Sequence, residues 1–297
     1  MRVSFSVDLK PKSGKQNFAV LLSRAFIKKG IKVVSKKPDI NLVFVKGVKK
    51  GCKNILRLDG AWMNNKMNYK GKNKRIASTM RQCDGVIYQS EYSRKVCQKF
   101  IGKHKIHRVI YNGCDPDVFH KKYEHRKPYV LACSRWRPHK RLSVIIKGFL
   151  SSGISDEHDL LICGDPDVHV KHPSIMYLGR QRIRDIYKIT AGCAFVSHLA
   201  YLDCCPNSVV ESLVAGKRVL FSKSGGTPEI VKDSGIGIDD KKYKFKAIDL
   251  YKPPILSMDS IVSAYKQLVD DDSQIFRPDL NIDHVVDQYL DYMESIL

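Results

Sequence analysis

The chain has 297 residues, 43% of them hydrophobic, and its 52 Lys and Arg outnumber its 30 Asp and Glu, giving a formal net charge of +22. This length suits two compact domains, and the hydrophobic content excludes a disordered chain. The charge favours anionic partners such as nucleotide phosphates, nucleic acid or acidic lipid headgroups, although lysines spread through the whole chain also fit an ordinary solvated surface.

Short apolar runs alternate with amphipathic stretches in residues 1–122, which we assign to an amino-terminal domain. The predicted strands are Val3–Val7, Lys32–Val34, Asn41–Val45, Ile55–Leu58, Gly85–Gln89 and Arg108–Tyr111. Their Val, Ile, Leu, Phe and Tyr content is typical of buried parallel strands. Between the first two strands, Asn17–Lys29 places apolar side chains on one helical face, and Gly30 predicts its end.

The same alternation resumes after the polar stretch Lys121–Pro128, so we place the domain boundary there and assign 123–280 to a second domain. Its predicted strands are Tyr129–Cys133, Leu160–Cys163, Ile175–Leu178, Ala194–Ser197 and Val219–Ser222, and its predicted helices are Lys140–Leu150, Arg184–Thr190, Ser208–Ala215 and Ser260–Val269. Residues 281–297 are expected to form a terminal helix, for which packing back on the first domain is one open arrangement. Repeated strand–helix alternation predicts an α/β fold with parallel sheets.

The segment Tyr201–Val231 holds the strongest candidate site. Asn207 and Ser208 are good N-cap residues for the helix that follows, and a helix start at the carboxyl end of a strand suits a diphosphate. Glu211, about one turn inside, provides a carboxylate that can accept both hydroxyls of a ribose. Gly225 and Gly226 allow backbone to approach a ligand closely. Each residue alone also fits the caps and turns of any α/β protein, so the prediction rests on the ordered set.

A second candidate is the basic loop from Ser134 to Arg141, which follows a strand and precedes a helix. Its four cations, Arg135, Arg137, Lys140 and Arg141, would neutralise phosphate charge, and arginine does so with two parallel hydrogen bonds. An ordinary basic surface loop is the alternative.

Together these residues carry a resemblance to a known family. Asp203 and Glu211, with seven residues between them and followed by Gly-Lys-Arg-Val and Ser-Gly-Gly-Thr-Pro-Glu, resemble the donor-site signature of family 4 retaining glycosyltransferases. The signature usually has two glutamates, and the first is Asp203 here. The Arg-x4-Lys pair of that family matches Arg135 and Lys140.

The resemblance implies a GT-B fold, in which two Rossmann-like domains have parallel sheets facing across a cleft. It implies that Arg135 and Lys140 hold the donor diphosphate, that Glu211 binds the ribose, and that Asp203 and the backbone through Ser208 face the sugar and phosphates. It also implies transfer with retention and without a metal, so that the nucleoside-diphosphate sugar is a co-substrate and no cofactor is needed.

Weaker similarity extends into the first domain. Gly14, before the first predicted helix, resembles the glycine loop that approaches the donor phosphates. Asp59, after the strand Ile55–Leu58, stands where many relatives have a His near the transferred sugar. A carboxylate there could hydrogen-bond a sugar hydroxyl or the acceptor, and an ordinary Asp-Gly turn explains Asp59 equally well. The first domain is also shorter than is usual for the family.

Two Asp-Pro-Asp triplets, Asp115–Asp117 and Asp165–Asp167, resemble the metal motif of single-domain glycosyltransferases, but they also fit ordinary turns, and we assign no metal site. The nine cysteines lack zinc-ligand spacing and indicate reduced thiols. With no export signal and no long apolar stretch, we expect a cytoplasmic protein, for which peripheral contact with an anionic membrane stays open.

The sequence therefore predicts a glycosyltransferase that moves a sugar from a nucleoside-diphosphate sugar to a glycan, lipid or protein-linked acceptor. A different GT-B enzyme, such as an inverting transferase or a sugar-nucleotide epimerase, is the first alternative. A basic nucleic-acid-binding protein is an alternative of another class, but dispersed charge and the lack of a nucleic-acid-binding motif argue against nucleic acid as a partner.

Overall fold

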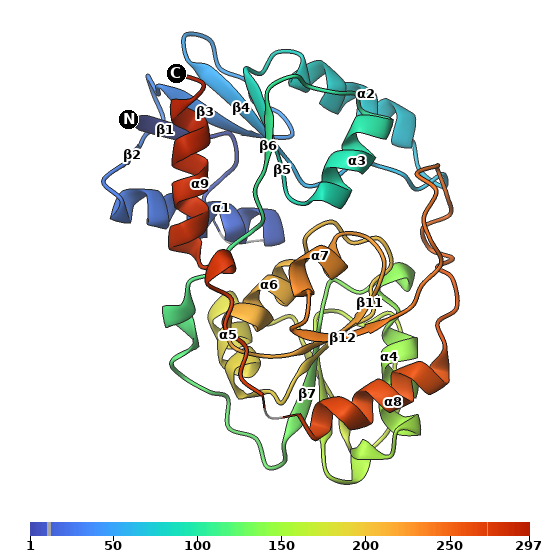
Figure 1. Cartoon of the computed structure of the whole chain (residues 1–297). Coiled ribbons are helices and arrows are strands. Elements are labelled where there is room, and N and C mark those ends of the chain that lie inside the picture. The colour runs from blue at the N-terminus through green and yellow to red at the C-terminus, as the bar shows by residue number, and fades with distance from the viewer. Residues whose placement is uncertain (11–12, 272) are drawn as a thin grey trace. The chain divides into compact units, whose positions relative to one another are not determined.

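The computed structural model describes residues 1–10, 13–271 and 273–297 and divides into two compact units. Unit 1 comprises Met1–Asp115, Phe245–Ile248 and Asp279–Leu297, and unit 2 comprises Pro116–Lys244 and Asp249–Pro278 (Figure 1). Each unit is built around its own parallel sheet of six strands. The predicted α/β class is therefore confirmed.

The sheet of unit 1 has the strand order β2-β1-β3-β4-β5-β6. Its strands are β1 (Arg2–Phe5), β2 (Lys32–Val33), β3 (Ile40–Phe44), β4 (Lys53–Leu58), β5 (Gly85–Tyr88) and β6 (His107–Val109). All six predicted strands of this half are present, and no strand end differs from its predicted position by more than two residues. The central strands are buried along their whole length, which is why they contain long apolar runs and not an alternating pattern.

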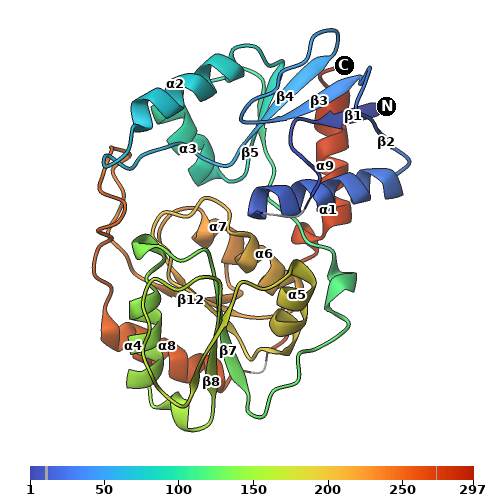
Figure 2. The ribbon, with the colours of Figure 1, turned by 180° about the vertical axis from the view of Figure 1, so that it is seen from behind.

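Helices cover both faces of this sheet. On one face, α1 (Gly14–Lys28) and α9 (Ile282–Glu294) pack side by side over β1, β3 and β4 (Figures 1 and 2). On the other face, α2 (Tyr69–Met80) and α3 (Glu91–Phe100) contribute Ile76, Met80 and Cys97 to a second apolar cluster. Helices α2 and α3 were not predicted, because α2 buries only four of its residues and both helices are rich in polar side chains.

The sheet of unit 2 has the order β12-β11-β10-β7-β8-β9. Its strands are β7 (Tyr129–Cys133), β8 (Asp159–Cys163), β9 (Ile175–Gly179), β10 (Val196–His198), β11 (Val219–Ser222) and β12 (Gly235–Ile238). Strand β12 was not predicted because two of its four residues are glycines. Gly235 is needed there, because a Cβ at this position would lie 2.0 Å from the carbonyl oxygen of Val219 on β11.

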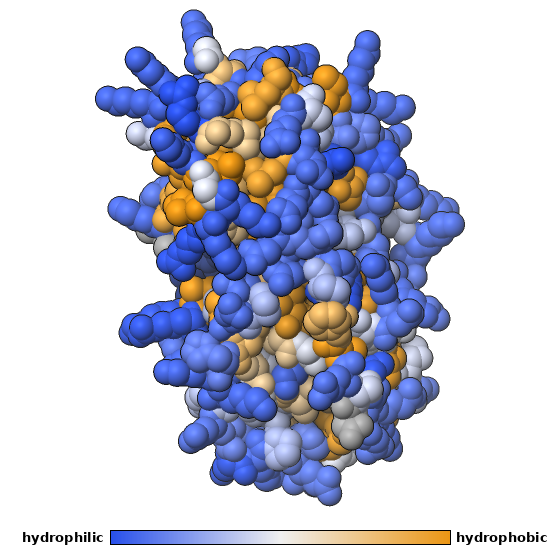
Figure 3. Space-filling view, turned by 60° about the vertical axis from the view of Figure 1, so that its left-hand side comes forward, coloured by the Kyte–Doolittle hydropathy of each residue, from blue (hydrophilic) through white to orange (hydrophobic). Residues whose placement is uncertain are grey.

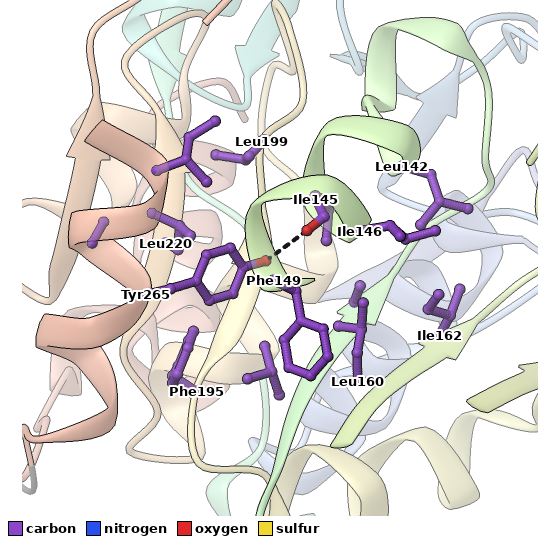
Figure 4. Packing of buried hydrophobic residues seen from close by; sticks show 14 of the residues in the cluster. Leu142, Ile145, Ile146, Phe149, Leu160, Ile162, Phe195, Leu199, Leu220 and Tyr265 are labelled. Atoms are coloured by element: carbon purple, nitrogen blue, oxygen red, sulfur yellow. Dashed lines mark hydrogen bonds between the residues drawn. The ribbon is translucent and has the colours of Figure 1, made fainter. Parts of the chain in front are cut away.

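The helices of unit 2 again lie on two faces. They are α4 (Leu142–Ser151), α5 (Ile183–Gly192), α6 (Asn207–Val214), α7 (Thr227–Val231) and α8 (Met258–Val269). Helices α4 and α8 form the main core with β7 and β8, as Figure 4 shows. Within it the Tyr265 hydroxyl hydrogen-bonds with the carbonyl of Ile145 at 3.3 Å and with Ser197 Oγ at 2.9 Å, so the one polar atom of this buried ring is satisfied.

The surface agrees with the composition. Hydrophilic side chains cover most of the face shown in Figure 3, with smaller hydrophobic areas between them. Among the residues that the structure describes, no helix has the length and apolar character needed to cross a membrane. All nine cysteines are free thiols.

Candidate functional site

The strand order of unit 2 places a topological switch point between β7 and β10. The chain runs from β7 outward through β8 and β9, and then returns to place β10 on the other side of β7. In open parallel sheets, ligands bind beyond the carboxyl ends of the strands at such a point. The loops that follow β7 and β10 contain the two candidate regions predicted from sequence, the basic loop and the Asp203 loop.

Lys140 and Asp203 meet at this switch point. The Lys140 ammonium pairs with Oδ2 of Asp203, and both side chains are more than three-quarters buried. Nε2 of the buried His198, the last residue of β10, lies 3.3 Å from the same oxygen. Burial alone would raise the pKa of Asp203, but Lys140 and His198 outweigh it and hold that pKa well below its usual range. The site therefore holds a carboxylate and an ammonium together.

The backbone of Asp203 is fixed by the glycine turn. Gly225 has φ +73°, and a Cβ there would lie 2.3 Å from the carbonyl oxygen of Asp203. The amide of Gly226 donates to that same carbonyl at 2.7 Å. Both predicted glycines therefore lie directly against Asp203, and only glycine fits at position 225.

Two buried histidines surround the pair. Burial lowers the pKa of His198, and it lowers the pKa of His139 to about 4, with Lys140 adding to the effect. The His139 ring stacks on the Tyr251 ring with centroids 5.9 Å apart. The backbone carbonyl of His139 accepts a hydrogen bond from the amide of Tyr201 at 2.8 Å. At neutral pH the His139 ring is therefore uncharged, and the cation that pairs with Asp203 is Lys140.

Arg141 corrects the expectation of four phosphate-binding cations in the basic loop. Its side chain is 2% exposed and pairs with the fully buried Asp240 at 2.8 Å. It also donates to the carbonyls of Leu199 at 3.1 Å and Pro254 at 2.7 Å. Arg141 is therefore turned inward, where it ties the loops after β7, β10 and β12 together. The predicted helix start at Lys140 moves to Leu142, because Pro138–Lys140 forms a 3-10 turn and Arg141 has φ +58°.

Helix α6 begins at Asn207, but not through the predicted cap. The N-cap residue is Pro206, which makes no side-chain cap bond, and Asn207 and Ser208 form the first turn of the helix. The prediction that these two residues act as N-caps was wrong, because proline already supplies the extended backbone that precedes a helix.

Glu211, one turn further on, is half-buried, and burial raises its pKa to about 7.

Arg135 lies in the same loop as Lys140 but is exposed and makes no hydrogen bond or ion pair within the described residues. The structure thus brings Lys140, Asp203, Gly225 and Gly226 into contact and leaves Arg135 at the surface.

Asp165, of the second Asp-Pro-Asp triplet, forms an exposed ion pair with Arg180 at 3.4 Å. Over residues 1–10, 13–271 and 273–297, no group of three His, Cys, Asp or Glu side chains is arranged to hold a metal ion.

Two of the predicted site residues, Gly14 and Asp59, belong to unit 1. Gly14 is the first residue of α1, whose cap is Ser13; Ser13 Oγ accepts from the Gln16 amide at 3.4 Å and donates to Gln16 Oε1 at 2.9 Å. Asp59 follows β4 and accepts hydrogen bonds from Arg57 and Gln89. Arg57 was not predicted as a site residue, although an arginine inside the otherwise apolar run Ile55–Leu58 is an unusual feature of the sequence.

Solved structures share this fold over essentially the whole chain. The Anabaena protein HepE, crystallised with UDP and glucose, matches with a TM-score of 0.68 at 14% identity, covering 99% of this chain and 100% of HepE. The fold is GT-B. The sucrose-phosphate synthase of Thermosynechococcus elongatus matches this GT-B chain with a TM-score of 0.67 at 10% identity, covering 99% of this chain and 94% of the synthase. WaaG, a glycosyltransferase involved in lipopolysaccharide biosynthesis, matches with a TM-score of 0.65 at 11% identity, covering 99% and 95%.

No protein-family model and no curated protein sequence matches this chain. At 10–14% identity the structural likeness establishes the GT-B fold and leaves the activity to be argued from the site.

Proposed function

We propose that this chain is a glycosyltransferase that takes a sugar from a nucleoside-diphosphate sugar. The observation that carries the proposal is the contact of Lys140, Asp203 and the Gly225–Gly226 turn at the switch point of unit 2. HepE, which has the same fold, was crystallised with UDP-glucose and with UDP and glucose. A diphosphate bound there would displace the Asp203 carboxylate from the Lys140 ammonium and pair with that ammonium itself. The Asp203 carboxylate would then accept a hydrogen bond from a sugar hydroxyl.

The proposed chemistry is substitution at the anomeric carbon with a nucleoside diphosphate leaving. The leaving group gains negative charge in the transition state, so fixed positive charge beside it lowers the barrier. In this proposal Lys140, the exposed Arg135 and the amides at the start of α6 supply that charge, and Glu211 binds the ribose. We further propose retention of configuration, as in the family 4 enzymes that the sequence resembles, and no requirement for a metal. The acceptor is a glycan, a lipid or a protein-linked sugar.

Thermal unfolding with UDP, GDP and ADP, each with and without EDTA, tests the donor site. Binding to the folded state alone stabilises it by about 2.7 kcal/mol at a ligand concentration of 100 Kd. One nucleotide is expected to raise the melting temperature in the wild type and much less in Lys140→Ala. Lys147→Ala is the matched control, because Lys147 is an exposed lysine on α4 away from Asp203.

The outcomes separate the alternatives. No stabilisation at millimolar nucleotide, or an equal loss in both lysine variants, would contradict the donor site. Stabilisation that EDTA abolishes would contradict metal independence. Release of the β-anomer of glucose first, seen by proton NMR during hydrolysis of UDP-glucose, would contradict retention and favour the inverting alternative.

A further inference from the structure

Unit 1 contains an arginine that is buried inside its sheet. Arg57, on β4, is 2% exposed and is among the largest fully buried side chains of the described residues. A buried cation is costly unless it is paired and its donors are satisfied. The contacts of Arg57 therefore show what the surrounding residues are arranged to hold.

Five side chains from five elements or their ends hold the guanidinium. It donates to Asp59 just after β4, to Asn112 shortly after β6, and to the hydroxyl of Tyr289 on α9 at 3.2 Å. Its Cζ lies 4.5 Å from the ring centroid of Phe18 on α1 and 5.3 Å from that of Phe44 on β3. Arg57 is thus fixed both by a fork of acceptors and by aromatic faces.

The carboxylate that this arginine holds is not buried. The Asp59 side chain is 42% exposed, whereas Asp240, which pairs with the buried Arg141 in unit 2, is 0% exposed. Within the described part of the chain, Oδ1 of Asp59 accepts from both Arg57 and Gln89, and Oδ2 accepts no hydrogen bond. Gln89 is itself held by Asn112, whose Nδ2 donates to its Oε1 at 3.3 Å.

The position of this carboxylate matches a ligand site. Asp59, Gln89 and Asn112 all follow neighbouring parallel strands, so they gather at the carboxyl edge of the sheet, where ligands bind in α/β folds. A pair that served only stability could be closed to solvent, as the Arg141–Asp240 pair is. An exposed oxygen on a carboxylate whose other oxygen is already committed is a fixed hydrogen-bond acceptor, and its natural partner is a hydroxyl group.

We propose that Arg57, held by Tyr289 and Asn112, is a positioning residue that fixes Asp59 so that Oδ2 accepts a hydrogen bond from a hydroxyl of the transferred sugar. This inference rests on the proposed function. It assigns to α9 a part in substrate binding, because the Tyr289 hydroxyl holds the arginine that orients the carboxylate.

The test compares two Tyr→Phe variants on the same helix. Tyr289→Phe removes the hydroxyl that contacts Arg57. Tyr292→Phe is the matched control, because the buried Tyr292 hydroxyl bonds to the amide and carbonyl of Val86 at 3.0 and 3.2 Å and does not contact Arg57. Nucleotide release from UDP-glucose with water as acceptor gives kcat and KM; the GDP or ADP sugar is used instead if that nucleotide stabilises the chain. Both variants are expected to lower the melting temperature.

Only Tyr289→Phe is expected to lower kcat/KM, by about threefold to tenfold, as loss of one positioning hydrogen bond does. Asp59→Asn is expected to lower it further while UDP affinity stays unchanged, and Tyr289→Phe is expected to add nothing in the Asp59→Asn background. A rise in KM shows that the hydrogen bond already forms when the donor binds, and a fall in kcat at constant KM shows that it forms only in the transition state. Equal kcat/KM in the two tyrosine variants, or additive losses with Asp59→Asn, would overturn the inference.

The proposed function and this inference fail separately. If no nucleotide stabilises the wild type and no nucleotide sugar is cleaved, the glycosyltransferase proposal fails. If the donor is bound and cleaved but Tyr289 and Asp59 are uncoupled, only the positioning role fails. Because Tyr289→Phe leaves every charge in place, the comparison stands even if Asp59→Asn does not fold.

Discussion

Glu211 is a carboxyl group whose environment opposes its charge. Burial raises its pKa from its ordinary value of 4.5 to about 7. The folded state therefore holds this proton more tightly than the unfolded state does. The corresponding stability is present below about pH 4.5 and is lost as the pH rises through 7, so above pH 7 the buried carboxylate is a cost.

We expect Glu211→Gln to remove that cost. A shift of this size corresponds to about 3 kcal/mol at most, and partial solvent access reduces it to roughly 1–2 kcal/mol. Denaturant unfolding should therefore show Glu211→Gln more stable than the wild type at pH 8 and no more stable at pH 4.5. Glu157→Gln, an exposed carboxylate in the same unit, should show no such change. A Glu211→Gln variant that destabilises equally at both pH values would show that the carboxylate is instead paired in the fold.

Gly225 is required by both its backbone angle and its neighbour. An alanine there would adopt φ +73° and place its Cβ 2.3 Å from the Asp203 carbonyl, which is backbone and cannot rotate away. The left-handed angle costs roughly 1–2 kcal/mol and forced overpacking roughly 1–3 kcal/mol. We expect Gly225→Ala to lower the free energy of unfolding by about 3 kcal/mol and to abolish nucleotide binding.

Gly153→Ala separates these two effects. Gly153 has φ +78°, and a Cβ there meets nothing within 4 Å. Its substitution should cost about 1 kcal/mol, from the backbone angle alone, and leave nucleotide binding intact. Similar losses in the two variants by urea unfolding would show that the Asp203 loop moves to accommodate the methyl group.

At the scale of elements, Arg141 links the loops that carry the candidate site. Its charge is paired with Asp240, and Ser222 Oγ at the end of β11 donates to the same carboxylate at 2.7 Å. Removing one member of a buried pair leaves the other charge unpaired, which costs roughly 3–5 kcal/mol. We expect Arg141→Met to destabilise the chain by about that amount in urea unfolding, and Arg141→Met with Asp240→Asn to recover part of it.

The neighbouring exposed pair is the control for this measurement. Lys223 and Asp239 lie 2.9 Å apart with side chains 50% and 91% exposed. Lys223→Met should cost less than about 1 kcal/mol, because water competes with and screens such pairs. If the two methionine variants lose equal stability, Arg141 is not the link between these loops.

Sequence patterns predicted the elements whose own residues define them. Buried strands such as β3 and β7 consist mostly of apolar residues, so their length and composition were sufficient. Strand β12 and helix α2 could not be found this way, because β12 exists through close approach to Val219 and α2 is held by a few buried residues in a polar stretch. Tertiary contacts decide such elements, and a single sequence does not show them.

The same limit applies to the candidate site. The order of Lys140, Asp203 and the glycine pair could be read along the chain, because ligands of α/β folds gather after strands. The inward direction of Arg141 and the burial of Arg57 could not be predicted, because the sequence does not show which way an arginine side chain points. The positive φ of Gly225 and the contact between Asp203 and His198 likewise depend on the fold and could not be predicted from sequence.

At the scale of the whole molecule, each unit has its own apolar core and its own sheet. Units built in this way can unfold with separate midpoints, and a ligand stabilises the unit that binds it. The chain has two tryptophans, Trp62 in unit 1 and Trp136 in unit 2, so each unit has one fluorescent reporter. Trp62→Phe leaves the reporter of unit 2, and Trp136→Phe leaves that of unit 1.

We expect the nucleotide identified by the screen to raise the midpoint reported by Trp136 more than the midpoint reported by Trp62. The physical reason is that Lys140, Asp203 and Glu211 all belong to unit 2, so binding energy enters that unit first. Trp62→Phe should be nearly neutral, because Trp62 is 38% exposed, whereas Trp136→Phe should lower stability, because the buried Trp136 donates to the Cys163 carbonyl at 2.9 Å. Equal shifts from both reporters across a range of nucleotide concentrations would mean that the two units unfold as one cooperative body, and then the stabilisation could no longer be assigned to unit 2 alone.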